Sequence, residues 1–118
     1  MTSETSRQEN QMALEILFSL PNFATLYDEL SDLYGDEVTM QVIFDAMAEL
    51  LDEMVEEGDL TTAKAYLNTV DSLLEEKFNL YEEIIYCFIA NLNCLDEEYF
   101  ASLLPPALTA ACLDEGYI

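Results

Sequence analysis

The sequence predicts an all-α fold, a single domain of six or seven short antiparallel helices, and three observations support this. Apolar residues recur at the i, i+3, i+4, i+7 spacing of helices with one buried face. Glycines, prolines and capping residues interrupt the pattern about once per helix length. Only one stretch, 84–90, has a strand-like composition, and no second strand is available to pair with it. We therefore expect a helical bundle or a short stacked array of helix hairpins.

The chain is long enough for one core. It has 118 residues, of which 52% are hydrophobic, and this apolar content argues against disorder despite the high charge. We expect one domain over residues 1–118, in which residues 1–6 form a frayed end. The sequence contains no composition shift that would indicate a linker.

Caps and helix breakers predict where each helix begins and ends. Ser6 and Glu9 form an S-x-x-E capping box, and Pro21 separates the first helix from a second that stops at Gly35. The third helix, starting at Asp36 or Glu37, is the longest. The fifth is apolar on nearly all sides, so we expect it to be the central, most buried one. The predicted ranges are 6–20, 21–34, 36–57 (ended by Gly58), 59–77 (capped by Asp59, closed by Lys77), 79–92 (capped by Asn79), 96–104 (capped by Asp96) and 106–113.

The charge of the chain is strongly one-sided. It has 25 acids and 3 bases, a formal net charge of −22, and between Arg7 and Lys64 there are fourteen acids and no base. Like charges repel most strongly in a compact chain, so this excess works against folding. It points to a partner of opposite charge rather than to a reaction.

Several functions are excluded or disfavoured by composition. Without histidine, no Ser-His or Cys-His nucleophile can form, and with three glycines no glycine-rich phosphate loop is possible. No calcium-loop spacing occurs. We therefore predict no catalytic residue, no cofactor and no metal ligand, and hence a protein that is not an enzyme. Direct binding of nucleic acid is disfavoured because phosphates would be repelled.

The cellular setting is also constrained. The apolar runs are shorter than the roughly 20 residues of a membrane-spanning helix, and the N-terminus lacks a signal-peptide pattern. We expect a cytoplasmic protein with no membrane association. Cys87, Cys94 and Cys112 are odd in number and lie among apolar residues, which indicates reduced thiols in the core.

The third predicted helix carries the candidate partner-binding residues, which we call the acidic ridge. Its neighbours at i, i+4 are like-charged, and each such pair destabilises a helix by about 0.2–0.5 kcal/mol. Glu56 and Glu57 also lie at the C-terminal end of this helix, where the helix dipole is negative. An uncompensated cost of this kind suggests function, although a solvated face that keeps the protein soluble is the alternative. The acidic ridge comprises Asp45, Glu49, Asp52, Glu53, Glu56 and Glu57.

These observations favour a non-enzymatic protein-binding module with a basic partner. The first hypothesis is an immunity-type inhibitor that neutralises a basic toxin or nuclease by electrostatic occlusion. A second is a DNA-mimic inhibitor, in which carboxylates take the place of phosphates. A third is an adaptor or structural domain that binds through an apolar groove, with the acids serving only solubility. Nothing in the sequence predicts the oligomeric state.

One stretch resembles known proteins. The residues Leu26-Tyr27-Asp28-Glu29-Leu30 together with the run from Gly35 to Ala46 are similar to a group of small, acidic, helical, uncharacterised bacterial proteins. The chain also resembles, more loosely, the small immunity proteins of polymorphic-toxin systems. That second likeness rests on size, helicity and charge, and it implies no particular functional residue.

Because the net charge opposes folding, added salt should stabilise the protein. We expect the melting temperature to rise when NaCl is increased from about 10 mM to about 500 mM, since the Debye length falls from about 30 Å to a few ångströms. Differential scanning calorimetry measures this directly. A melting temperature that stays flat or falls would show that self-repulsion costs less than the charge indicates.

Overall fold

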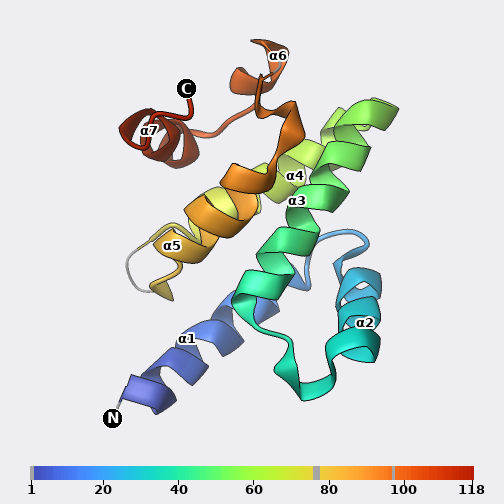
Figure 1. Ribbon diagram of the computed structural model, residues 1–118, viewed down its shortest axis with the longest axis vertical. Coiled ribbons are helices and arrows are strands. Elements are labelled where there is room, and N and C mark those ends of the chain that lie inside the picture. Colours follow the sequence, from blue (N-terminus) through green and yellow to red (C-terminus); the bar gives the residue numbers. More distant parts are fainter. Residues whose placement is uncertain (1, 76–77, 97) are drawn as a thin grey trace.

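The structure is a computed structural model, and it confirms the all-α prediction (Figure 1). It describes the backbone of residues 2–75, 78–96 and 98–118, and the side chains of 10–75, 78–95 and 99–118. Within these ranges there is no β-strand, and no helix is both long and apolar enough to cross a bilayer. The elements are α1 (Thr2–Leu17), α2 (Phe23–Tyr34), η1 (Gly35–Glu37), α3 (Met40–Glu57), α4 (Leu60–Ser72), α5 (Tyr81–Glu83), η3 (Ile84–Phe88), η4 (Ile89–Asn91), η5 (Asn93–Asp96), α6 (Glu98–Ala101) and α7 (Pro106–Asp114).

Helix α3 is the centre of the packing. It contacts α2, α4, α5 and the three short segments η3, η4 and η5 (Figure 1). The expectation that the 79–92 segment would be the central helix is therefore wrong. Its Ile84, Ile85, Phe88 and Ile89 are fully buried, but Tyr86 is 55% exposed, because α3 covers one face of this segment and not the other.

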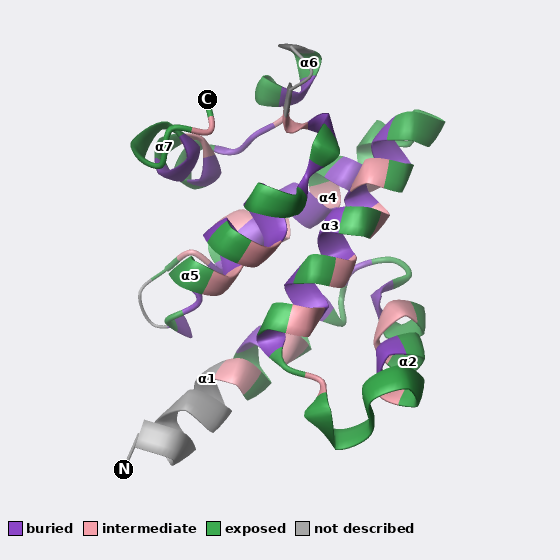
Figure 2. Ribbon diagram, viewed as in Figure 1, coloured by how far each residue is buried: buried purple, intermediate pink, exposed green. Residues whose placement is uncertain are grey.

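One hydrophobic core joins residues from α1 to α7 (Figure 2). The rings of Phe44 on α3 and Phe88 on η3 meet edge to face with centroids 6.3 Å apart, a geometry that aromatic pairs favour. At the α1–α2 corner, Phe18 packs its edge against Phe23 at 5.1 Å. The largest fully buried side chains are Tyr66, Phe23, Phe44, Phe88, Phe100, Leu17, Ile43, Met47, Leu51, Leu67, Leu73 and Ile84.

The hairpin of α3 and α4 has the ends that its sequence predicts. Gly58 adopts φ 79°, and the backbone N–H of Asp59 donates to the carbonyl O of Met54 at 2.9 Å, which completes a Schellman-type stop. The Asp59 carboxylate then accepts from the N–H of Thr62 at 3.3 Å and caps α4. The predicted stop of the second helix at Gly35, with φ 61°, is confirmed as well.

Other boundaries in the N-terminal half differ from prediction. Helix α3 begins at Met40 rather than at 36 or 37, because a 3₁₀ turn at 35–37 comes first and the Thr39 hydroxyl caps the helix, accepting from Val42 N at 3.3 Å. Helix α1 begins at Thr2, so Ser6 lies inside it and does not open it; the side chains of this capping box are outside the described residues. Asn22, at φ 67°, moves the start of α2 from Pro21 to Phe23.

The C-terminal half shows larger differences. Helix α4 ends at Ser72, short of Lys77, which is outside the described residues. Asn79 is in the left-handed region at φ 53° and does not cap α5, whose N-cap residue is Leu80 with no side-chain hydrogen bond. The predicted 79–92 helix is divided into an α turn, a π segment and a 3₁₀ turn. The predicted cap at Asp96 depends on a side chain outside the described residues, whereas the last helix, at 106–114, agrees with prediction.

A hydrogen bond ties α4 to the α1–α2 corner. The hydroxyl of Tyr66, whose side chain is fully buried, donates to the carbonyl O of Pro21 at 2.6 Å. Burial raises the pKa of Tyr66 from 10.0 to about 12. The folded-state pKa lies above the unfolded value. The phenol therefore makes its full contribution to the free energy of unfolding below about pH 10, and this contribution is lost as the pH rises through about 12.

Comparing Tyr66→Phe with the native protein tests this contact. At about pH 8 we expect the variant to lose about 0.5–1.5 kcal/mol of unfolding free energy, since one hydrogen bond is removed. Near pH 11.5 the difference should shrink, because only the native protein must keep a phenol protonated in its core. Urea unfolding at both pH values measures the difference, and the other tyrosines are common to both proteins. An equal difference at both pH values would contradict the raised pKa.

Candidate partner-binding site

The structure divides the acidic ridge into two groups that differ in their hydrogen bonds. Asp45 and Asp52 face the segments that follow α5. The Asp45 carboxylate accepts from the side-chain amide of Asn91 at 2.7 Å. The two oxygens of Asp52 accept from the backbone N–H groups of Asn93 and Cys94, each at 3.0 Å. These two acids therefore have a structural use that their sequence position did not reveal.

The other four residues of the acidic ridge form what we call the glutamate face. All four side chains are exposed, and none makes a hydrogen bond or ion pair to another side chain that the structure describes. They lie within nine residues of one another, on the half of α3 that ends at Gly58. The glutamate face comprises Glu49, Glu53, Glu56 and Glu57.

The charge of the glutamate face is not balanced by nearby bases. Among described side chains, Lys64 on α4 is the sole base, and it is exposed. No ion pair joins two residues of this described set. The acids that do have partners use neutral donors instead, as Asp71 does when it accepts from the backbone N–H of Leu108 at 2.8 Å. The glutamate face therefore projects an uncompensated negative potential.

A shallow apolar groove adjoins the glutamate face, and we call it the α2–α3 groove. Its volume is about 280 Å³. Leu26, Leu30 and Leu33 of α2 line it together with Ala46 and Leu50 of α3. Leu33 is 77% exposed although it lies on the same face of α2 as the buried Leu30. Three glutamates also line the groove: Glu29, Glu49 and Glu53.

Sequence reasoning missed this groove, although a signal was present. Helix α2 has 12 residues and six large apolar side chains, of which only Phe23 and Leu30 are buried. One neighbouring helix cannot bury the whole apolar surface of a short helix when that surface is so wide. Leu26 and Leu33, two of the apolar side chains that are not buried, line the groove beside α3.

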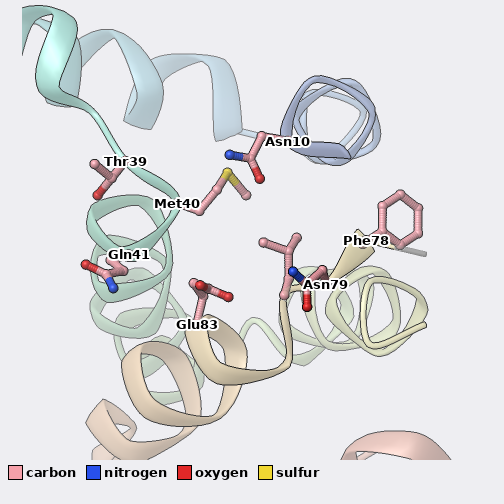
Figure 3. A pocket seen from close by; sticks show the side chains of 8 residues that line it. Asn10, Thr39, Met40, Gln41, Phe78, Asn79 and Glu83 are labelled. Carbon is pink, nitrogen blue, oxygen red and sulfur yellow. The ribbon is translucent and has the colours of Figure 1, made fainter. Parts of the chain in front are cut away.

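A second hollow of about 360 Å³ lies between the start of α3 and the segment before α5 (Figure 3). The side chain of Glu83 lies at its wall, and one carboxylate oxygen, Oε2, is buried without a hydrogen-bond partner. Thr39, Met40 and Gln41, at the first turn of α3, form another wall. The positive end of the α3 dipole offsets part of the free-energy cost of burying that carboxylate oxygen without a hydrogen bond. The polar groups that line the hollow are carboxamides, the Thr39 hydroxyl and the Glu83 carboxylate.

Burial lowers the reactivity of two of the three cysteines. Cys87, Cys94 and Cys112 are not joined in disulfides; the last two are buried and Cys87 is half-buried. Burial raises the pKa of Cys112, and burial together with the charges of Asp45 and Glu83 raises the pKa of Cys87. Both thiols therefore stay protonated and weakly nucleophilic near neutral pH. In the described ranges, no three Cys, Asp or Glu side chains are placed to hold a metal ion.

Comparison with known proteins identifies a family and no function. Residues 13–117 match the family model Domain of unknown function (DUF7674). No curated protein and no solved structure matches the chain. The expected likeness to an uncharacterised family is therefore confirmed as membership of a family of unknown function, which carries no known activity.

The division of the acidic ridge predicts different stability effects at neighbouring positions. Asp52→Ala should lower the unfolding free energy by about 1–3 kcal/mol, because two backbone N–H groups lose a charged acceptor. The matched control Glu53→Ala should change it by less than about 0.5 kcal/mol, or raise it, because a like-charge neighbour is removed. Urea unfolding of both variants checks this. Equal losses for the two would mean that Asp52 does not hold the 93–94 turn.

Proposed function

The chain belongs to the DUF7674 family, and from that premise we propose that it is a non-catalytic protein-binding module that recognises a basic protein through its glutamate face. One observation carries this proposal. Four exposed glutamates lie within nine residues of α3, and no described side chain neutralises them. The proposal accounts for a feature that the fold itself does not need.

The acids of α3 differ in what they contribute to the stability of the fold. Asp45 and Asp52 gain hydrogen bonds from the C-terminal segments, so their charge contributes to the fold. The pairs Glu49/Glu53 and Glu53/Glu57 gain nothing, and each costs about 0.2–0.5 kcal/mol. Glu57 also lies at the negative end of the α3 dipole. Bases on a partner turn the same four charges into favourable contacts.

The partner that fits best is a basic toxin or nuclease, and the chain then acts as an immunity-type inhibitor. Enzymes that act on nucleic acids need basic surfaces to hold phosphates, so a compact acidic face can occlude such a surface. A negative field also speeds the encounter, and association can reach about 10⁸–10⁹ M⁻¹s⁻¹ at low salt. Rapid capture is what neutralising a toxin requires.

The geometry gives less support to imitation of DNA. A duplex carries one charge per about 1.7 Å of axis, whereas carboxylates one helical turn apart are separated by about 5.4 Å. With Asp45 and Asp52 engaged in hydrogen bonds, the free row contains four carboxylates. A row this short favours a local plug over a copy of an extended phosphate backbone.

A pair of matched triple variants tests the proposal. The first is Glu49→Lys, Glu53→Lys and Glu56→Lys on the glutamate face. The control is Glu15→Lys, Glu82→Lys and Asp114→Lys, which are exposed positions on α1, α5 and α7. Each replacement adds two charges, so both triples carry −16 instead of −22. Circular dichroism first establishes that both are folded.

Each protein is immobilised and used to capture proteins from cell extract at low salt, followed by elution with NaCl and mass spectrometry. The native chain and the control triple should retain the same basic protein, and the face triple should lose at least 90% of it, a tenfold drop equal to about 1.4 kcal/mol. The purified partner should lose its toxic or nuclease activity when one equivalent of native chain is added. Equal retention by both triples would reject the glutamate face as the binding site.

A further inference from the structure

We propose that the α2–α3 groove receives an amphipathic basic helix of the partner, with apolar side chains on the groove floor and lysines or arginines against its acidic rim. This inference rests on the proposed function and specifies the part of the partner that is bound. It also combines electrostatic binding with binding in an apolar groove, which are separate hypotheses when only the sequence is considered.

The floor of the groove argues for apolar anchors. Leu33 is 77% exposed, and Leu26 and Leu50 are half-buried, so apolar surface remains to be covered. Its volume of about 280 Å³ lies just below the roughly 300–1,000 Å³ typical of small-molecule pockets. Its size therefore suits a few protein side chains better than a free metabolite.

The rim of the groove determines the charge of the occupant. Glu29 extends from α2, and Glu49 and Glu53 extend from α3, so carboxylates come from both lining helices. A second copy of the chain carries −22 and is repelled, and anionic lipid surfaces are repelled for the same reason. Lysine and arginine complement this rim, since their long apolar stems pack beside the leucines while the charged ends reach the carboxylates.

The lining helices favour a helical occupant. The groove runs between α2, with 12 residues, and α3, with 18. The residues of α2 that line the groove run from Leu26 to Leu33, which at 1.5 Å per residue is about 10 Å, or about two turns of a third helix. A helix with apolar residues at i, i+3 or i+4, and i+7 places them in one row along such a groove.

The groove is also continuous with the glutamate face. Glu49 and Glu53 belong to both, while Glu56 and Glu57 extend the charge toward the end of α3. A basic helix seated in the groove therefore has further carboxylates beside it, and the partner can contact both surfaces at once. This continuity is why the groove and not the hollow beside Glu83 is the better site for a protein.

The probe is a synthetic helix-favouring peptide of about 14 residues, with leucines at i, i+3, i+7 and i+10 and lysines on both flanks. One control peptide has the same composition in scrambled order, and another has glutamate in place of every lysine. Binding is measured by fluorescence anisotropy at about 50 mM and 500 mM NaCl. The proteins are the native chain, Leu33→Gln, and the matched control Leu113→Gln on α7, a leucine that is also exposed. Both leucines are exposed, so neither replacement endangers the core.

We expect the lysine peptide to bind the native chain and Leu113→Gln equally, and Leu33→Gln at least tenfold more weakly. The scrambled peptide should also bind at least tenfold more weakly, the glutamate peptide should not bind, and added salt should weaken the lysine peptide several-fold. No binding by the lysine peptide, or equal binding to Leu33→Gln, overturns the groove. Equal binding of the glutamate peptide overturns the basic occupant.

The result separates this inference from the proposed function. If the groove fails while the glutamate-face triple still loses the captured basic partner, the glutamate face is the binding site and the groove is not. If the peptide binds as expected while the face triple and the control triple retain the partner equally, the groove can bind a basic helix, but the captured partner uses neither the glutamate face nor the groove rim, since Glu49 and Glu53 belong to both.

Discussion

Asp52 on α3 accepts hydrogen bonds from two consecutive backbone N–H groups, those of Asn93 and Cys94, and this contact shows how an acidic chain is held together. With three bases among 118 residues, ion pairs cannot supply partners for 25 acids. Backbone amides and neutral side chains supply them instead. Asp71 does the same for Leu108 at the start of α7, so carboxylates from the α3–α4 hairpin anchor the C-terminal third of the chain. A charged acceptor at such an N–H group is worth more than a neutral one.

This use of carboxylates gives the polar face of α3, opposite its apolar stripe, two kinds of surface. Asp45 and Asp52 belong to the fold through their hydrogen bonds, whereas the fold does not use the glutamate face, of which Glu56 lines a hollow beside Asp52. The apolar stripe, including Phe44, contacts the π segment η3 and fixes the orientation of both surfaces. The proposed site therefore lies on a central helix instead of a loop, and helices hold the geometry of a site more precisely than loops do.

Local signals were reliable where one residue determines the backbone. Gly58 in the left-handed region and the Asp59 cap were predicted correctly because each depends only on neighbours in the sequence. Asn79 was predicted as a cap and is not one, since its backbone takes φ 53° to bring the chain to α5. The π segment had no signal in the sequence at all. Its hydrogen-bond pattern accompanies the burial of Ile84, Ile85 and Phe88 against α3, which is a tertiary effect.

The sequence by itself determined the helical class, the charge, the absence of histidine chemistry and the helix that carries the acidic ridge, because composition and the 3.6-residue period require no knowledge of neighbouring helices. Only the tertiary structure decided which acids are free. Asp52 and Glu53 are adjacent and chemically alike, yet one caps a turn 41 residues away and the other lines the α2–α3 groove. That difference depends on which segment packs against each side of α3, and long-range packing is not encoded at either position alone.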